Sequence, residues 1–94
     1  MIVRLMGEGQ WRVDDALGPH LDELDADTER AVQAGDEAAL EASLRALHDA
    51  VRNAGQKLDH AHLAPSDAVV PPLDLTLDEA RQLLEGDEAI PDLP

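Results

Sequence analysis

Hydrophobic residues recur at helical spacing most clearly over residues 36–54. Four aliphatic side chains fall within an arc of about 60° on this segment when each residue turns by 100°: Leu40, Leu44, Leu47 and Val51. The opposite face is charged. Asp36 is placed as an N-cap, and Gly55 stands where a left-handed residue often ends a helix. The pattern predicts an amphipathic helix around which the other elements pack.

A second helical phase precedes it, with apolar or small residues on one face at Leu17, Leu21, Leu24, Ala31 and Val32. Because proline is accepted in the first turn, we expect this helix to span residues 19–34 and to stop at Gly35. The polar run over residues 25–28 is expected to kink or split it. Since only Gly35 and Asp36 separate the two helices, they should form an antiparallel hairpin.

Alternation and β-branched residues predict strands over residues 2–6 and 10–13, joined by the loop Gly7-Glu8-Gly9. A third strand is expected over residues 67–70, where Pro71 ends it. An isolated hairpin is marginal in water, so packing on the helices should stabilise this sheet. We expect the segment from residue 56 to residue 65, where periodicity disappears, to be a loop.

Thr76 and Glu79 form the sequence signature of a capping box, which predicts a short helix over residues 77–85. The tail over residues 87–94 is expected to be flexible. The sequence therefore predicts a single α+β domain over residues 1–94. It should contain a small antiparallel sheet of two or three strands, packed on a helix hairpin, and a short C-terminal helix.

Charge and composition disfavour several classes of function. Twenty-one acidic and seven basic residues give a net charge of −14, which disfavours direct binding to nucleic acid or anionic lipid. The chain lacks cysteine, and no run approaches the ~20 apolar residues of a membrane span. We therefore expect a cytoplasmic protein without direct membrane insertion. Such a charge favours solubility, or a surface that attracts a basic partner and weakens its hold as salt rises.

Candidate chemistry is sparse. His60 and His62 point the same way if their segment is extended, but a metal site needs a third ligand, so we predict no metal site. His20 and His48 are expected at the surface or at the boundary of the core. Ser43 and Ser66 lack a local nucleophile motif. We expect neither catalysis nor a cofactor.

Several short motifs keep an order and spacing that resemble one protein family. The chain opens with MIVRLMGEGQWRVDD, and the most distinctive segments that follow are Pro65-Ser66-Asp67, Pro71-Pro72 and Thr76-Leu77-Asp78-Glu79-Ala80. This arrangement resembles the PspA-associated proteins (PspAA), small partners encoded beside the phage shock protein PspA. The resemblance implies a non-catalytic adaptor or regulator that binds a PspA-like coiled-coil protein in the envelope stress response. It would lie peripheral to the inner membrane through that partner, which it would recruit, hold inactive or stabilise.

Four residues are candidates for the apolar part of the partner interface: Trp11, Val69, Val70 and Leu73. Trp11 is the only aromatic residue, and core packing is its main alternative role. A function of another class is an acidic mimic of nucleic acid that inhibits a basic DNA- or RNA-binding protein. A mimic should present its carboxylates along one extended face, whereas here they are spread over several elements together with six Arg.

Overall fold

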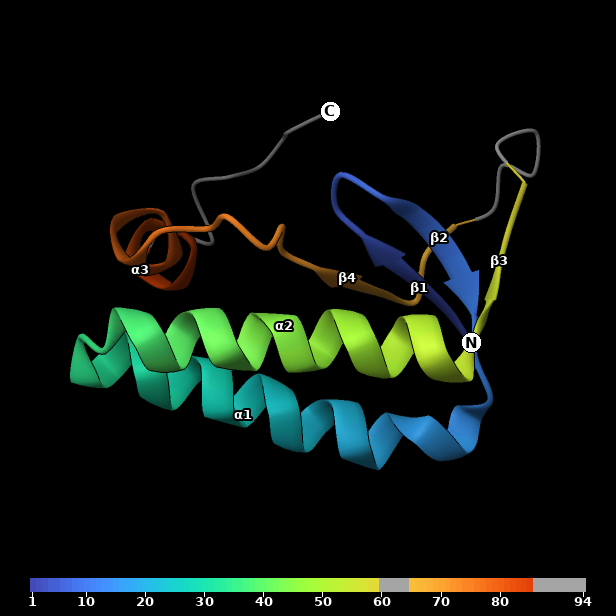
Figure 1. Cartoon of the computed structure of the whole chain (residues 1–94), viewed down its shortest axis with the longest axis horizontal. Helices are drawn as coiled ribbons and strands as arrows, with labels where there is room; N and C mark the ends of the chain where they lie inside the picture. Colours follow the sequence, from blue (N-terminus) through green and yellow to red (C-terminus); the bar gives the residue numbers. More distant parts are fainter. Residues whose placement is uncertain (60–64, 86–94) are drawn as a thin grey trace.

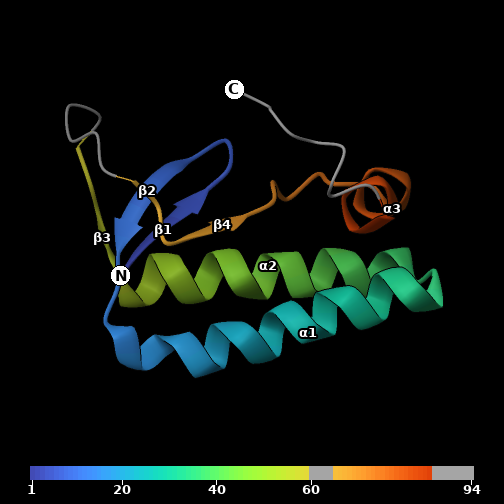
Figure 2. The same cartoon turned by 180° about the vertical axis from the view of Figure 1, so that it is seen from behind.

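The computed structural model describes residues 1–59 and 65–85, and the tail predicted over residues 87–94 lies outside them. Its elements follow one another as β1 (Ile2–Leu5), β2 (Gly9–Arg12), the 3₁₀ turn η1 (Asp15–Leu17), α1 (Gly18–Ala34), α2 (Glu37–Ala54), β3 (Gln56–Lys57), β4 (Ala68–Val70) and α3 (Leu77–Glu85). The strands and α3 lie on the same side of the antiparallel pair α1 and α2 (Figure 1), and the reverse view in Figure 2 agrees. The predicted α+β class is confirmed.

The sheet is mixed and has four strands in the order β3-β2-β1-β4 among the described residues, where two or three antiparallel strands were expected. β1 pairs with β2 in antiparallel fashion, but it pairs with β4 in parallel, with Val3 opposite Ala68 and Leu5 opposite Val70. The chain between β1 and β4 contains two other strands as well as the two helices, so no tight turn fixes the direction of β4 relative to β1. A tight hairpin allows only the antiparallel arrangement.

The helix pair follows its local signals. Asp36 caps α2 by accepting a hydrogen bond from the Ala39 N–H at 3.0 Å, and Gly35 ends α1 with a left-handed φ of 68°. The polar stretch was expected to kink or split the helix, and a split was wrong, because α1 runs unbroken through it. Thr28 faces α2 there, where its hydroxyl lies 3.0 Å from that of Ser43 and 3.1 Å from the Leu24 carbonyl oxygen. A polar side chain is thus satisfied inside the interface without interrupting the helix.

Two predictions near the end of α2 were wrong. Gly55 is extended, with φ −109° and ψ 173°, and Gln56–Lys57 forms β3 beside β2 where a loop was expected. A Cβ added at Gly55 would stand 2.6 Å from Val13 Cγ1 and 2.8 Å from the Val51 carbonyl oxygen. Glycine is therefore required by the close approach of α2 to the end of β2, and it lets the chain turn directly into the sheet.

The core consists of two clusters that share α2. Under the sheet, Leu47 and Val51 contact buried residues of the strands and of α1 in the first cluster: Val3, Leu5, Trp11, Val13, Leu21 and Val70. Toward the other end, Leu40 and Leu44 contact Ala31, Val32 and Ala80 in the second cluster. One helix therefore joins a sheet core to a smaller helical core.

α3 closes the second cluster, and its N-terminus has the predicted capping box. The Glu79 carboxylate accepts a hydrogen bond from the Thr76 N–H at 3.0 Å, while the Thr76 hydroxyl accepts one from the Glu79 N–H at 3.2 Å. The Leu77 N–H donates to Glu37 of α2 at 3.2 Å. The start of α3 is therefore fixed both locally and to the first turn of α2.

The Trp11→Ala substitution should destabilise the fold by about 3–5 kcal/mol, because it removes a large core side chain that is only 6% exposed. It also removes the ring over which the Lys57 ammonium lies, 5.3 Å from the centroid. Urea denaturation measures the change. Met6→Ala is the matched control, since Met6 is 46% exposed and should change the free energy of unfolding by less than ~1 kcal/mol. Equal effects of the two substitutions would contradict core packing of Trp11.

Candidate partner-binding site

The four interface candidates divide into two buried and two exposed residues. Trp11 and Val70 are each only 6% exposed, so their side chains pack within this chain. Val69 is 56% exposed and Leu73 is 37% exposed. Met6, which was not singled out from the sequence, is also exposed and donates its N–H to the Val70 carbonyl oxygen at 3.0 Å. The large exposed apolar side chains among the described residues therefore lie at or beside β4.

Beneath the edge of β4 the structure has a cavity of about 170 Å³. Strands, helices and the residue after β4 all contribute to its lining: Val3, Leu21, Asp22, Asp25, Leu47, Ala68, Val69, Val70 and Pro71. Four of its lining residues, Val3, Leu21, Leu47 and Val70, belong to the sheet core, and its two polar residues come from α1. Because β4 is an edge strand, the cavity lies at the border of the sheet.

On the acidic side of this cavity, the ionised form of Asp25 is disfavoured. Partial desolvation raises the pKa of the Asp25 carboxyl, and the neighbouring carboxylates of Glu29 and Asp22 raise it further. No ion pair among the described residues involves any of these three carboxylates. The rim of the cavity is therefore an acidic surface whose repulsion is uncompensated within the described chain.

His48, which was expected at the surface or at the boundary of the core, is fully buried in α2 and contacts Pro71, one of the residues that line the cavity. Its Nε2 lies 2.7 Å from the Pro71 carbonyl oxygen, and its Nδ1 lies 2.8 Å from the Glu8 carboxylate. A carbonyl oxygen can only accept, so Nε2 is the donor in the contact with Pro71. Arg52 donates to the other Glu8 oxygen at 2.9 Å. The hairpin loop, α2 and Pro71 are thus held together through one imidazole.

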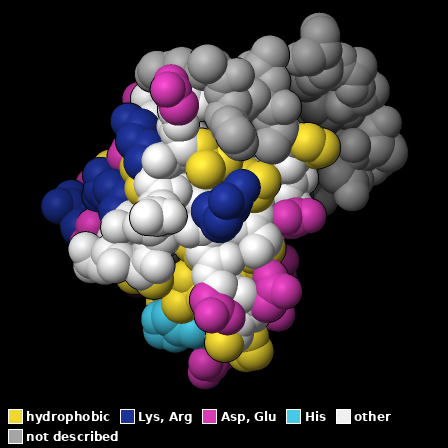
Figure 3. Space-filling view, turned by 90° about the vertical axis from the view of Figure 1, so that its right-hand side faces the viewer, with side chains coloured by type: hydrophobic (Ala, Val, Ile, Leu, Met, Phe, Trp, Pro, Cys, Tyr) yellow, Lys and Arg dark blue, Asp and Glu magenta, His cyan; other side chains and the backbone are white. Residues whose placement is uncertain are grey.

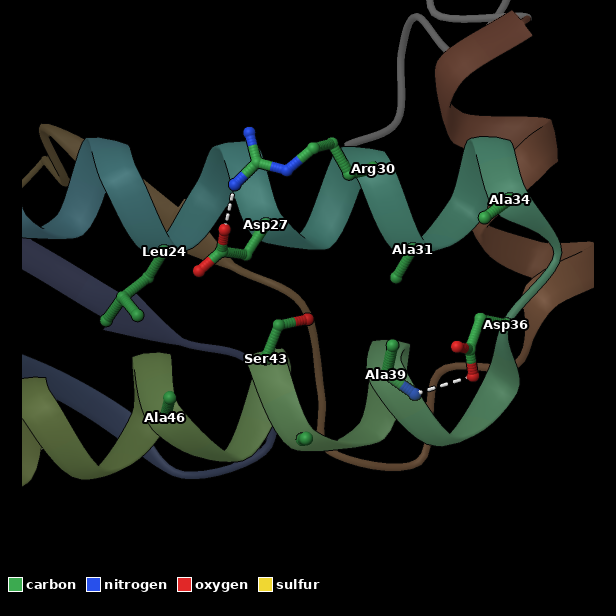
Figure 4. A pocket seen from close by; sticks show the side chains of 10 residues that line it. Leu24, Asp27, Arg30, Ala31, Ala34, Asp36, Ala39, Ser43 and Ala46 are labelled. Carbon is green, nitrogen blue, oxygen red and sulfur yellow. Dashed lines mark hydrogen bonds and ion pairs between the residues drawn. The ribbon is translucent and has the colours of Figure 1, made fainter.

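A second, wider hollow of about 470 Å³ lies between α1 and α2 (Figure 4). Small side chains line most of it, including Ala31, Ala39 and Ala46. Its charged groups already have partners, since Arg30 pairs with Asp27 and Asp36 caps α2. This groove therefore offers shape for a partner but little uncompensated charge.

Basic residues gather on the sheet in a way that their spacing in the sequence did not show. Arg4, Arg12 and Lys57 are three of the seven basic residues, and the four described strands contain no acidic one. Arg4 stands opposite Gln10 and Val69 on the face turned away from the helices. On the end of the molecule seen in Figure 3, Lys and Arg lie mainly to the left and centre, and most Asp and Glu lie lower and to the right. On this end of the molecule the basic and acidic side chains are therefore largely separated.

Other chemistry that was considered from the sequence has little support within the described residues. No group of three or more His, Cys, Asp or Glu side chains is placed there to hold a metal ion, and His60 and His62 lie outside that part of the chain. His20 is exposed on α1. No helix in the described ranges combines the length and the apolarity needed to cross a membrane.

Comparison with known proteins identifies the family. A family model described as PspA-associated protein, PspAA, matches residues 1–92. The chain belongs to the PspAA family. Neither a curated protein nor a solved structure matches it. The PspAA assignment agrees with the resemblance in the sequence motifs, and it indicates a role as a partner of PspA.

The Glu8→Ala substitution in this PspAA chain should lower the free energy of unfolding by about 1–3 kcal/mol, because it leaves a buried nitrogen of His48 without its partner. Urea denaturation measures the loss. Glu41→Ala is the matched control, since it removes only an exposed contact with Arg45 at 3.8 Å and should change stability by less than ~0.5 kcal/mol. A loss for Glu8→Ala no larger than that of the control would contradict the proposed role of the His48 contacts.

The Asp25→Asn substitution should stabilise the fold at pH 7. Since the folded pKa of Asp25 is raised, the native state binds this proton more tightly than the unfolded state does. The contribution of Asp25 to the stability of the fold therefore becomes more favourable as pH falls through the folded pKa. Asparagine does not titrate, so the variant is not stabilised in this way. Melting curves between pH 7 and pH 4 should show an advantage for the variant that shrinks on acidification.

Asp27→Asn is the control for this comparison, because Asp27 pairs with Arg30 and its loss should not stabilise the chain. The explanation fails if Asp25→Asn lowers the melting temperature at pH 7, or if its advantage grows toward low pH.

Proposed function

We propose that this chain is a non-enzymatic adaptor or regulator that binds a PspA-like coiled-coil protein in the envelope, or phage shock, stress response. The family match over residues 1–92 is the observation that carries the proposal. The chain would act from the cytoplasm and reach the membrane only through that partner. Its small, largely aliphatic core and its exposed apolar residues beside an acidic rim are suited to protein contact.

The β4 side is the surface that best supports such contact. Of the four candidates, Trp11 and Val70 are buried in the core, whereas Val69 and Leu73 are exposed and available for contact with a partner. Interfaces derive most of their energy from a few desolvated apolar residues, and charges around them govern the rate and the salt dependence of association. The acidic residues of α1 therefore favour a partner with basic patches.

Binding should be measured between the purified chain and the purified PspA-like protein of the same organism by isothermal titration calorimetry. We expect a complex that weakens as salt rises, because surface charges are screened. The double substitution Val69→Thr and Leu73→Ser should weaken it by roughly tenfold, since it removes exposed apolar contacts. The free energy of unfolding should change by less than ~1 kcal/mol, because both side chains are at the surface.

Gln33→Ser is the control, since Gln33 is exposed on α1, and its affinity should equal that of the unchanged chain. Absence of a complex at low and at moderate salt would refute the proposed function. Binding of a basic nucleic-acid-binding protein in its place would favour inhibition by mimicry.

A further inference from the structure

The cavity under β4 exists because a small residue occupies an inward-facing position. Ala68 stands opposite Val3 in the parallel pair, and Val3 is fully buried, so the Ala68 side chain is on the face of the sheet that covers the helices. A methyl group there leaves the space of about 170 Å³. Cavities of about 150 Å³ hold a benzene ring, so this one has room for one leucine- or methionine-sized side chain.

The lining is apolar at depth and acidic at one border. Val3, Leu21 and Leu47 belong to the sheet core, and each is at most 8% exposed. Asp22 and Asp25 supply the polar part of the lining, both from α1. A side chain that enters the cavity thus gains apolar contact, while the atoms next to it meet carboxylates.

The carboxylates lack a cation of their own. Neither Asp22 nor Asp25 takes part in an ion pair among the described residues, although three pairs form within α1 or within α2: Arg30 with Asp27, Arg45 with Glu41, and Arg52 with Asp49. Burial and like charges raise the pKa of Asp25, which indicates that its ionised form is disfavoured where it lies. A cation beside the cavity would relieve that repulsion.

We propose that this cavity is the anchor point for a basic amphipathic helix of the PspA-like partner, which inserts one aliphatic side chain beneath β4 and places Lys or Arg beside Asp22 and Asp25. This inference rests on the proposed function and names the part of the chain that performs it. Side chains three or four positions apart on a helix are neighbours, so one turn delivers both the apolar group and the cation.

The edge strand itself favours this occupant over an added strand. β4 is three residues long, and Pro71 and Pro72 follow it directly. Proline lacks the N–H that a ladder needs, and very short edge strands are poor templates for strand addition. The α1–α2 groove is the competing surface for a helix, but its charged rim is already paired.

The proposal is tested by a substitution at Ala68 that fills the cavity with a larger side chain of the chain itself. Ala68→Leu should keep or raise the melting temperature, because the new side chain occupies existing space, and it should weaken binding of the PspA-like protein by roughly tenfold or more. Ala42→Leu is the matched control, since it adds the same group to the α1–α2 groove, and its affinity should equal that of the unchanged chain. If Ala68→Leu fails to fold, Ala68→Val provides a smaller filling.

The charge is tested separately with the double substitution Asp22→Asn and Asp25→Asn. It should weaken binding at low salt by roughly threefold to tenfold, and it should flatten the salt dependence, because two of the attracting charges are gone. The inference is overturned if Ala68→Leu binds as the unchanged chain does, or if only Ala42→Leu weakens the complex. Those results leave the proposed function intact.

A partner-free measurement distinguishes failure of the site from failure of the proposed function. Titration with n-butylammonium should shift the ¹⁵N–¹H resonances of Val3, Leu21 and Ala68, and Ala68→Leu should abolish the shifts. Butyrate should shift them less, because its carboxylate meets Asp22 and Asp25. If the unchanged chain binds no PspA-like protein but shows these shifts, the cavity does bind an aliphatic cation and the proposed partner is wrong. If n-butylammonium leaves the resonances unmoved, the anchor site is refuted.

Discussion

The structure depends on one helix being buried from two directions. α2 places Leu47 and Val51 under the sheet, and it places Leu40 and Leu44 against the end of α1 and against α3. A chain of this size can bury only a modest number of apolar side chains, and here they form two clusters along the axis of α2. Any shift of α2 would therefore disturb both clusters. This explains why its ends are defined so closely, by the Asp36 cap and by the contact of Gly55 with Val13.

Polar groups inside this arrangement link the two clusters to the candidate site. In the described part of the chain every buried side-chain nitrogen and oxygen has a hydrogen-bond partner. Thr28 and Ser43 satisfy each other between α1 and α2, and His48 joins the hairpin loop to Pro71. A buried group that is fully satisfied specifies one arrangement of its neighbours. The wall of the β4 cavity is thus held by hydrogen bonds as well as by packing, and this favours a preformed site.

Features with local causes could be predicted from the sequence. Helical periodicity, the Asp36 cap, the stop at Gly35 and the capping box of Thr76 and Glu79 each act within a few residues, and the structure has all of them. Features that arise from distant segments could not. The burial of His48 involves Glu8 and Pro71, the parallel pairing joins β4 to the distant β1, and the extended Gly55 lies against Val13. The site follows the same division. Trp11, Val69, Val70 and Leu73 were named from the sequence as interface candidates, but periodicity did not show that Trp11 and Val70 are buried while Val69 and Leu73 are exposed. The cavity and the basic residues of the sheet appear only once the register of the strands is known.

The parallel pairing of β1 with β4 also has a consequence for how the chain is made. The Ile2 N–H donates to the Asp67 carboxylate at 2.7 Å, across 65 positions of the sequence. Contacts this remote slow folding, because a long loop must close before they form. At translation rates of about 5–20 residues per second, the first hairpin leaves the ribosome well before its last neighbour does. During that interval one edge of β1 exposes unpaired backbone groups, which are a template for association with other nascent chains. Synthesis, rather than the finished fold, is therefore the stage at which this sheet is most open to mispairing.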